Sequence, residues 1–305
     1  MRYKMYLSPV ILVLVLSCKG PTAESSRPAE PTKPAEPVQD SSNQISVKKP
    51  QQSLDPYAKA ALSIGYLLKA DAISWSEIDD KYKSVEQHIK SIDREYKTSY
   101  EKELPLALAE IKANKSVEVN RHVVTKGLQH VTVLTIGRLI DTLITGDLEH
   151  SKNVSKEIKN VFSAIEPTFK RRDDTIYGGK PTLLPETEST LAKLEAANSK
   201  PAIANVAMEL STLLSKTYVL SVLFEMKGVE EFCGTKTPDP DKCAVKRTEA
   251  GIYYRIIKEA VANRDKEADT KMEKMIGSEH GAPSYAKARD LLANVFPFTK
   301  EDLTF

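Results

Sequence analysis

Four polar side chains on one expected helix could hold a ligand. His122, His130, Arg138 and Asp141 fall within residues 116–145, where a long apolar run predicts a helix. The two histidines lie roughly 12 Å apart along such a helix, too far to share one metal ion. Arg138 and Asp141 are three residues apart and can meet on one face. The pattern predicts a metal or small-molecule site in a bundle core as one alternative, and structural or surface roles for the histidines as the other.

Motifs of common catalytic sites are absent from the sequence. We find no nucleophile signature of the Ser/His/Asp or Cys/His kind, no HExxH, no dinucleotide-binding glycines and no EF-hand loop. Gly178 and Gly179 lack the spacing of a phosphate-cradling loop. The sequence therefore predicts a protein that is not an enzyme and has no cofactor. Because carboxylates are abundant, a helical enzyme acting on cell-wall glycan is kept as an alternative.

A short apolar segment near the N-terminus predicts a secretory signal. Arg2 and Lys4 precede an apolar run at residues 7–16, about ten residues long, whereas a membrane-spanning helix needs ~20. The run closes with Val15-Leu16-Ser17-Cys18, which resembles the lipobox of bacterial lipoproteins. The resemblance implies that residues 1–17 are cleaved as a signal peptide and that Cys18 receives diacylglycerol and usually a third acyl chain, such as palmitate. A cleaved signal with an unmodified cysteine is the alternative.

The resemblance also implies where the protein resides. It places the chain in the cell envelope, anchored to membrane lipid through Cys18. Lys19, a residue that is not acidic, follows the cysteine and favours the outer membrane, facing the periplasm or the cell surface. Two or three acyl chains anchor a protein stably where a single chain does not.

The other two cysteines can pair once Cys18 carries lipid. Cys233 and Cys243 bracket a loop rich in helix breakers, which can bring its ends together. They lack CxxC spacing and a nearby histidine, so a disulfide is favoured over a redox or metal pair. A disulfide that closes so short a loop contributes about 2–3 kcal/mol to stability.

Composition excludes some partners and favours helices. Residues 1–17 carry two of the 44 Lys and Arg residues and none of the 42 Asp and Glu residues, so the cleaved chain is formally neutral. This balance gives no support to nucleic-acid binding. Only 12 of 305 residues are glycine, and 41% are apolar, which favours an all-α fold with a sizeable core.

The chain divides into a linker and a folded part. Residues 18–52 repeat proline among alanine, glutamate, serine and lysine, which predicts an extended spacer between the lipid and the folded domain. Residues 53–305 form the helical domain, a multi-helix bundle with one disulfide-closed loop. Two related halves, 53–165 and 185–305, are an option because residues 132–136 resemble residues 218–222. Two buried helices would look alike in any case.

Apolar spacing predicts the individual helices. The clearest begins at Ser74, which forms a capping box with Glu77. Phe296, Phe298 and Phe305 are expected to pin the C-terminal tail to the bundle. We expect a turn at 147–151 and an irregular stretch at 166–185, whose charged cluster 170–174 reads as solvated surface and is the first place to search for a binding surface. The expected helices span 55–70, 74–96, 103–113, 116–145, 154–165, 250–262, 266–276 and 283–295, with two more opening at Pro185 and Pro201.

The sequence thus predicts a lipid-anchored envelope protein whose helical domain binds or scaffolds a protein partner. The first alternative is a carrier of metal or a small ligand, and the second is the glycan-active enzyme. A buried polar cluster with an open cavity would favour the carrier. Two carboxylates facing each other in a groove would favour the enzyme, and a filled core with an exposed apolar patch would favour the scaffold.

Overall fold

The computed structural model describes residues 53–176, 182–234, 237–277 and 284–305. Over these ranges the chain forms eleven helices and no strand, which confirms the prediction of an all-α bundle. The expected signal peptide, Cys18 and the proline-rich linker lie outside the described residues. The helices are α2 (Asp55–Leu67), α3 (Trp75–Tyr96), α4 (Tyr100–Lys112), α5 (Val117–Thr145), α6 (Leu148–Phe162), α7 (Glu166–Ile176), α8 (Leu183–Ala196), α9 (Lys200–Cys233), α10 (Pro240–Arg264), α11 (Lys266–Gly277) and α12 (Tyr285–Val295).

Polar residues mark several helix starts. Ser199 and Asp239 occupy the N-cap positions of α9 and α10, and each side chain accepts a hydrogen bond from a backbone N–H of the first turn. Proline follows each of them at the start of the helix, where its missing N–H costs nothing. Ser74 caps α3 by position, but its side chain makes no capping hydrogen bond, so the expected capping box with Glu77 is not formed.

Two segments expected to be irregular are helical. The expected turn at 147–151 is the first turn of α6, since Asp147 is the N-cap and accepts a hydrogen bond from the His150 N–H. Within the expected loop at 166–185 lie α7 and the start of α8. The charged cluster on α7 is not a solvated surface, because Arg172 and Asp173 are both buried.

The Asp173 carboxylate is buried because it accepts hydrogen bonds from the backbone at the start of α8. Its Oδ1 accepts hydrogen bonds from the backbone N–H groups of Thr182 and Leu183 at 3.0 and 2.7 Å, and its Oδ2 accepts one from Leu184 at 3.0 Å. These N–H groups belong to the first turn of α8, where no partner exists within the helix. A side chain of α7 therefore caps α8, a contact that local sequence does not reveal.

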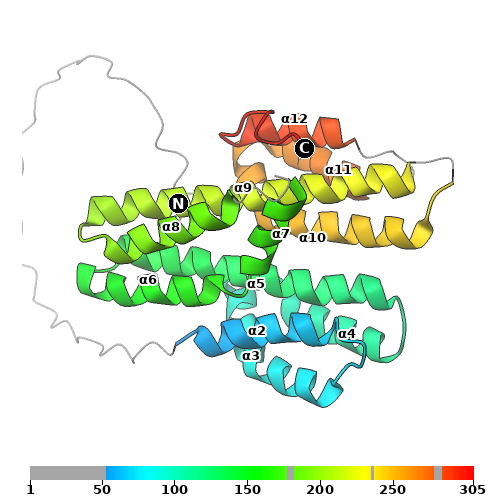
Figure 1. Ribbon diagram of the computed structural model, residues 1–305, viewed down its shortest axis with the longest axis horizontal. Coiled ribbons are helices and arrows are strands. Elements are labelled where there is room, and N and C mark those ends of the chain that lie inside the picture. The colour runs from blue at the N-terminus through cyan, green and yellow to red at the C-terminus, as the bar shows by residue number, and fades with distance from the viewer. Residues whose placement is uncertain (1–52, 177–181, 235–236, 278–283) are drawn as a thin grey trace, which may run out of the picture.

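Helix α5 is surrounded by other helices. It packs against α2, α3, α4, α6, α9 and α10, as expected for a helix that is apolar on nearly every side. Figure 1 shows α5 running between the group formed by α2, α3 and α4 and the group formed by α8 to α12. Its first half, around Val124 to Leu134, belongs to one apolar cluster with α2 to α4, and its second half, around Val133 to Leu143, belongs to a second cluster with α6 to α12. The two halves proposed from sequence, 53–165 and 185–305, stay a prediction.

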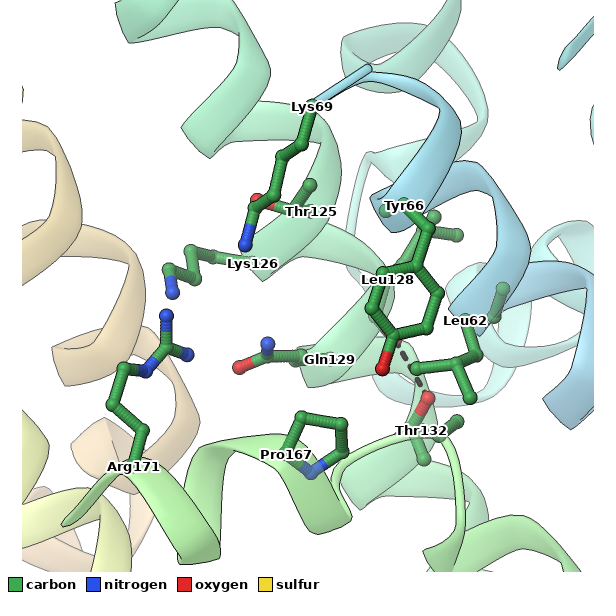
Figure 2. A pocket seen from close by; sticks show the side chains of 13 residues that line it. Leu62, Tyr66, Lys69, Thr125, Lys126, Leu128, Gln129, Thr132, Pro167 and Arg171 are labelled. Carbon is green, nitrogen blue, oxygen red and sulfur yellow. Dashed lines mark hydrogen bonds between the residues drawn. The ribbon is translucent and has the colours of Figure 1, made fainter. Parts of the chain in front are cut away.

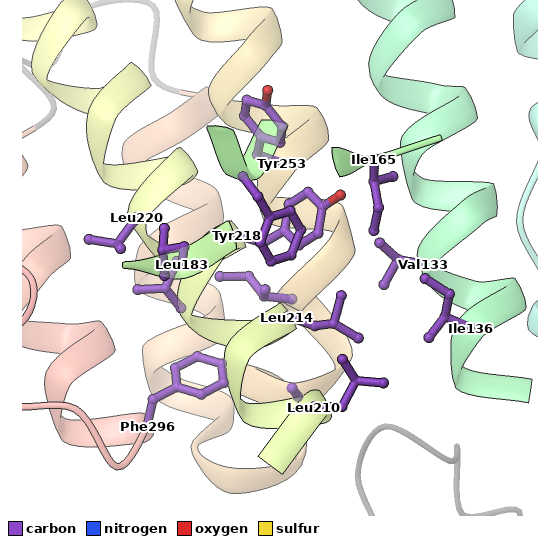
Figure 3. Close-up of a cluster of buried hydrophobic side chains, with 14 of the residues drawn as sticks. Val133, Ile136, Ile165, Leu183, Leu210, Leu214, Tyr218, Leu220, Tyr253 and Phe296 are labelled. Atoms are coloured by element: carbon purple, nitrogen blue, oxygen red, sulfur yellow. The ribbon is translucent and has the colours of Figure 1, made fainter. Parts of the chain in front are cut away.

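Helix α9 forms the axis of the second cluster. Figure 3 shows Leu210, Leu214 and Tyr218 of α9 facing Val133 and Ile136 of α5. Of the described helices, α9 alone is long and apolar enough to cross a membrane by length and composition, yet most of its apolar stretch is buried inside the bundle. It is therefore a core helix here.

Two expected local contacts are present. Cys233 and Cys243 are joined by a disulfide, with sulfurs 2.06 Å apart, so the end of α9 is tied to the first turn of α10. Phe296 and Phe298 are buried against the second cluster, and Phe305 packs on it. The aromatic residues of the tail thus hold the C-terminus to the bundle as predicted.

We predict that Asp173→Ala lowers the free energy of unfolding by on the order of 2 kcal/mol, because it leaves buried N–H groups of α8 without an acceptor. Urea unfolding followed by circular dichroism measures the change. Asp174→Ala is the matched control. The Asp174 carboxylate is next in the chain but exposed, so its loss should shift the unfolding midpoint little. Equal stability of the two variants would contradict the capping role.

Candidate functional site

Five charged side chains form a network inside the bundle. Lys126 of α5, Arg172 of α7, Glu225 of α9 and Glu249 of α10 are each at most 5% exposed, and Lys246 of α10 is half-buried beside them. We call these five residues the buried ion network. Burying a charge is costly unless a partner compensates it, so their mutual contacts decide how four helices fit together.

Arg172 is the most completely buried member. Its Nη2 donates to Glu225 Oε1 at 2.9 Å, and its Nε donates to Ser221 Oγ at 3.0 Å. The guanidinium carbon lies 4.4 Å from the centroid of the Phe224 ring, at the distance of a cation–π contact. Arg172 therefore links α7 to one face of α9.

Glu249 joins the other members. Its Oε2 lies 3.2 Å from Lys246 Nζ, and its Oε1 lies 3.6 Å from Lys126 Nζ and 3.0 Å from His122 Nδ1. Lys246 Nζ also reaches Glu225 Oε2 at 2.7 Å, which closes the network. Burial by itself would raise the pKa of Glu249, but the hydrogen bond from His122 and the charges of Lys126, His122 and Lys246 outweigh it and hold the pKa well below its ordinary value.

A cavity of about 240 Å³ opens beside this network, between α2, α5 and α7. Three cationic side chains line it: Lys69, just after α2, Lys126 of α5 and Arg171 of α7. Figure 2 shows their amino and guanidinium groups converging on one side of the cavity, next to the amide of Gln129. Among the described residues that line it there is no Asp or Glu. We call this cavity the cationic pocket.

The cations of the pocket act on one another. Burial and then the charges of Arg171 and Lys126 lower the pKa of Lys69 below its ordinary value. In the adjoining core, burial would raise the pKa of Tyr253, but the charges of Lys126, Arg172 and Arg171 lower it. Positive potential thus dominates the space around the pocket, and an anion placed there would relieve repulsion among its side chains.

Two polar atoms at the pocket have no hydrogen-bond partner within the described ranges. They are Gln129 Oε1 and Arg171 Nε, both buried from solvent. Arg171 makes one weak contact, from Nη2 to Thr168 Oγ1 at 3.4 Å. Tyr66, 59% exposed, stands at the rim. An unpaired guanidinium N–H is a donor available to an oxyanion.

The four residues singled out from sequence have different neighbours. His122 contacts Glu118 and Glu249, and His130 Nδ1 lies 2.6 Å from the Tyr100 hydroxyl. Arg138 Nη1 lies 3.5 Å from Glu95 Oε2, so its ion pair is with a residue of α3. The sequence had suggested a contact with Asp141 on its own helix.

The structure does not gather these four side chains into one site. Burial, together with Glu95, raises the pKa of Asp141 to about 6. In the described part of the chain, no group of three or more His, Cys, Asp or Glu residues could hold a metal ion. Ligand binding by His122, His130, Arg138 or Asp141 stays a prediction.

Sequence reasoning missed two of the three cations of the pocket, Lys69 and Lys126. Lys126 carries little signal, because it lies in the polar first half of its helix, before the apolar run at 131–144 that contains Arg138 and Asp141. Arg171 lies in the cluster 170–174, which was marked for a search for a binding surface. Nothing in the local sequence distinguishes Lys69. Comparison with known protein families, curated proteins and solved structures gave no match to this chain.

We predict that Glu249→Gln lowers the free energy of unfolding by about 3 kcal/mol at pH 7, because Lys126 and Lys246 lose a buried counter-charge. Since the folded pKa of Glu249 lies below its ordinary value of 4.5, its contribution is full above about pH 4.5 and is lost as the pH falls further. The difference between variant and wild type should therefore narrow at pH 3.5.

Urea unfolding at both pH values measures this difference. Glu231→Gln is the control, since Glu231 is exposed on α9. Two results would contradict the ion pairing of Glu249: a variant as stable as wild type at pH 7, or a difference in the free energy of unfolding that does not change with pH.

Proposed function

We propose that the protein is a lipid-anchored cell-envelope protein whose helical domain binds one small anion in the cationic pocket. The observation that carries the proposal is the convergence of Lys69, Lys126 and Arg171 on a cavity whose lining, as far as the structure describes the chain, holds no carboxylate. Charge-assisted hydrogen bonds from Arg and Lys are the usual means of holding carboxylates, phosphates and sulfates.

The balance of charges favours an anion with two negative charges. Lys126 already shares Glu249, whereas Lys69 and Arg171 have no ion-pair partner among the described residues. Two positive charges are therefore left uncompensated at the cavity. A tetrahedral oxyanion of the phosphate or sulfate type would neutralise both and could accept from the free Arg171 Nε–H.

The same observations favour the carrier over the other two functions considered from sequence. A buried polar cluster next to an open cavity is the arrangement expected of a carrier. The large exposed apolar side chains Tyr66, Leu106, Leu148 and Met208 come from four different helices, which gives the scaffold less support. Glu225 and Glu249 are engaged in ion pairs with buried cations, whereas glycan hydrolysis needs two carboxylates facing an open groove.

The lipid anchor and the proline-rich linker complete the proposal. Acyl chains on Cys18 would hold the protein at the membrane, and residues 19–52 would let the helical domain stand off the surface. The domain would then bind an anion in the space beside that membrane. Contact with an envelope protein partner stays a prediction.

We predict that phosphate or sulfate raises the thermal midpoint of a fragment starting at Gln51, at constant ionic strength set with chloride. A ligand at 100 times its dissociation constant should add about 2.7 kcal/mol. Arg171→Gln should weaken binding about tenfold or more, because it removes a charge-assisted donor. Lys156→Met, on the exposed face of α6, is the control and should leave binding unchanged. No shift with either anion, or equal shifts in both variants, would overturn the proposal.

The lipid anchor is tested separately. In bacterial cells fed labelled palmitate, the wild-type protein should carry the label, and Cys18→Ser should carry none because the acceptor sulfur is gone. The pair Cys233→Ser and Cys243→Ser is the matched control, and this variant should keep the label. A wild-type protein without label, or a label that persists in Cys18→Ser, would rule out acylation at Cys18.

A further inference from the structure

A second cavity lies between α5, α10 and the turn that joins α3 to α4. Its volume is about 460 Å³, within the range of ~300–1,000 Å³ typical of small-molecule sites, and it shares no lining residue with the cationic pocket. Helices α4 and α10 both pack on α5, and the ion pair between Arg255 Nη1 and Glu103 Oε2, at 2.8 Å, spans the space between them. We call this cavity the histidine groove, because His130 lines it.

His130 is the polar group at the inner wall of the groove. It is 6% exposed, and its Nδ1 is engaged by the Tyr100 hydroxyl at 2.6 Å. The other ring nitrogen, Nε2, has no hydrogen-bond partner in the ranges that the structure describes. Because Nδ1 is occupied, Nε2 is the nitrogen available to a molecule in the groove. The His130 side chain lines the groove, so Nε2 can make a hydrogen bond with a molecule that enters it.

The protonation of His130 follows from its neighbours. Burial, with help from the Arg255 charge, lowers the pKa of His130 to about 3, so the ring is neutral and carries one proton. Burial raises the pKa of Tyr100, so the phenol keeps its proton. Arg255 lies beside the phenol oxygen and can only donate to it. We infer that the Tyr100 O–H donates to Nδ1, which places the histidine proton on Nε2.

Close packing of α4 on α5 holds this arrangement in place. A Cβ at Gly127 would lie 2.7 Å from Leu104 Cδ2 and 3.2 Å from the Tyr100 ring, so a larger residue there would force these side chains of α4 to shift. The rings of Tyr100 and His130 meet edge to face with centroids 5.5 Å apart. Tyr100 is thus a positioning residue, which fixes the orientation of the His130 ring.

Much of the rest of the groove is apolar or already paired, although the buried Tyr96 hydroxyl has no hydrogen-bond partner among the described residues. Val133 and Leu134 of α5 and Ile256 and Ala260 of α10 supply apolar walls. Arg255 is paired with Glu103, and Lys258 contacts Asp269 and Glu273. A ligand here meets two neutral donors, the His130 N–H and the Tyr96 hydroxyl, beside apolar walls. The charged side chains of Lys97 and Glu259 also line the groove but are exposed and of opposite sign, in contrast to the cationic pocket.

We propose that the histidine groove binds an uncharged apolar molecule through a carbonyl oxygen that accepts a hydrogen bond from His130 Nε2. The pairing satisfies the Nε2–H of His130, while the rest of the molecule covers the apolar side chains. This site is independent of the anion site and would let the domain hold two chemically different ligands.

The test uses ¹⁵N-histidine labelling and NMR of the folded domain, with 2-octanone as the probe. The sequence has five histidines, and the His130 signals are assigned by their loss in His130→Phe. We expect the ring to carry its proton on Nε2 and this N–H to shift on titration with 2-octanone, while the ring signals of His150 on α6 stay in place. His130→Phe should weaken binding of the ketone roughly five- to tenfold.

Three results would overturn the proposal. One is a proton on Nδ1 of His130, and another is an unshifted Nε2–H up to the solubility limit of the ketone. Because both are observed in the wild-type protein, they do not depend on how well the variant folds. The third is a shift with octanoate and none with 2-octanone, which would assign the groove to anions.

Discussion

The pairing of buried charges is the constraint on which the rest of this structure depends. Arg172, Glu225, Lys246, Glu249 and Lys126 come from four helices. Except for the half-buried Lys246, none of them can lose its partners without leaving a charge in the core. The contacts therefore fix α5, α7, α9 and α10 relative to one another. The same contacts also position α5 and α7, two helices that line the cationic pocket. Arg172 faces the network, and its neighbour Arg171, about 100° further round α7, lines the cavity with Lys126.

Helix α5 supplies side chains to both cavities because other helices surround it on every side. Lys126 and Gln129 line the cationic pocket, whereas His130 and Val133 line the histidine groove. Positions one residue apart thus serve sites of different chemistry, one rich in positive charge and the other with apolar walls and neutral hydrogen-bond donors. A helix with one solvated face could not do this, since only its buried stripe would meet other elements.

The sequence predicts those features that depend on apolar periodicity or on residues close together in the chain. The apolar run at 131–144 predicted a central helix, and the breaker-rich loop between Cys233 and Cys243 predicted a disulfide. The charged segment of α7 was misread because its burial depends on Glu225, 53 residues away, and on the start of α8. The convergence of Lys69, Lys126 and Arg171 likewise exists only after folding, since the three residues come from three separate helical regions.

The most direct measurement for the central claim is a crystal structure of the helical domain soaked in selenate, a tetrahedral dianion that anomalous scattering at the selenium edge locates without ambiguity. The account predicts an anomalous peak in the cationic pocket, within hydrogen-bonding distance of Lys69, Lys126 and Arg171. A pocket without selenate in crystals that hold the ion elsewhere, or cationic side chains turned away from the cavity, would contradict it.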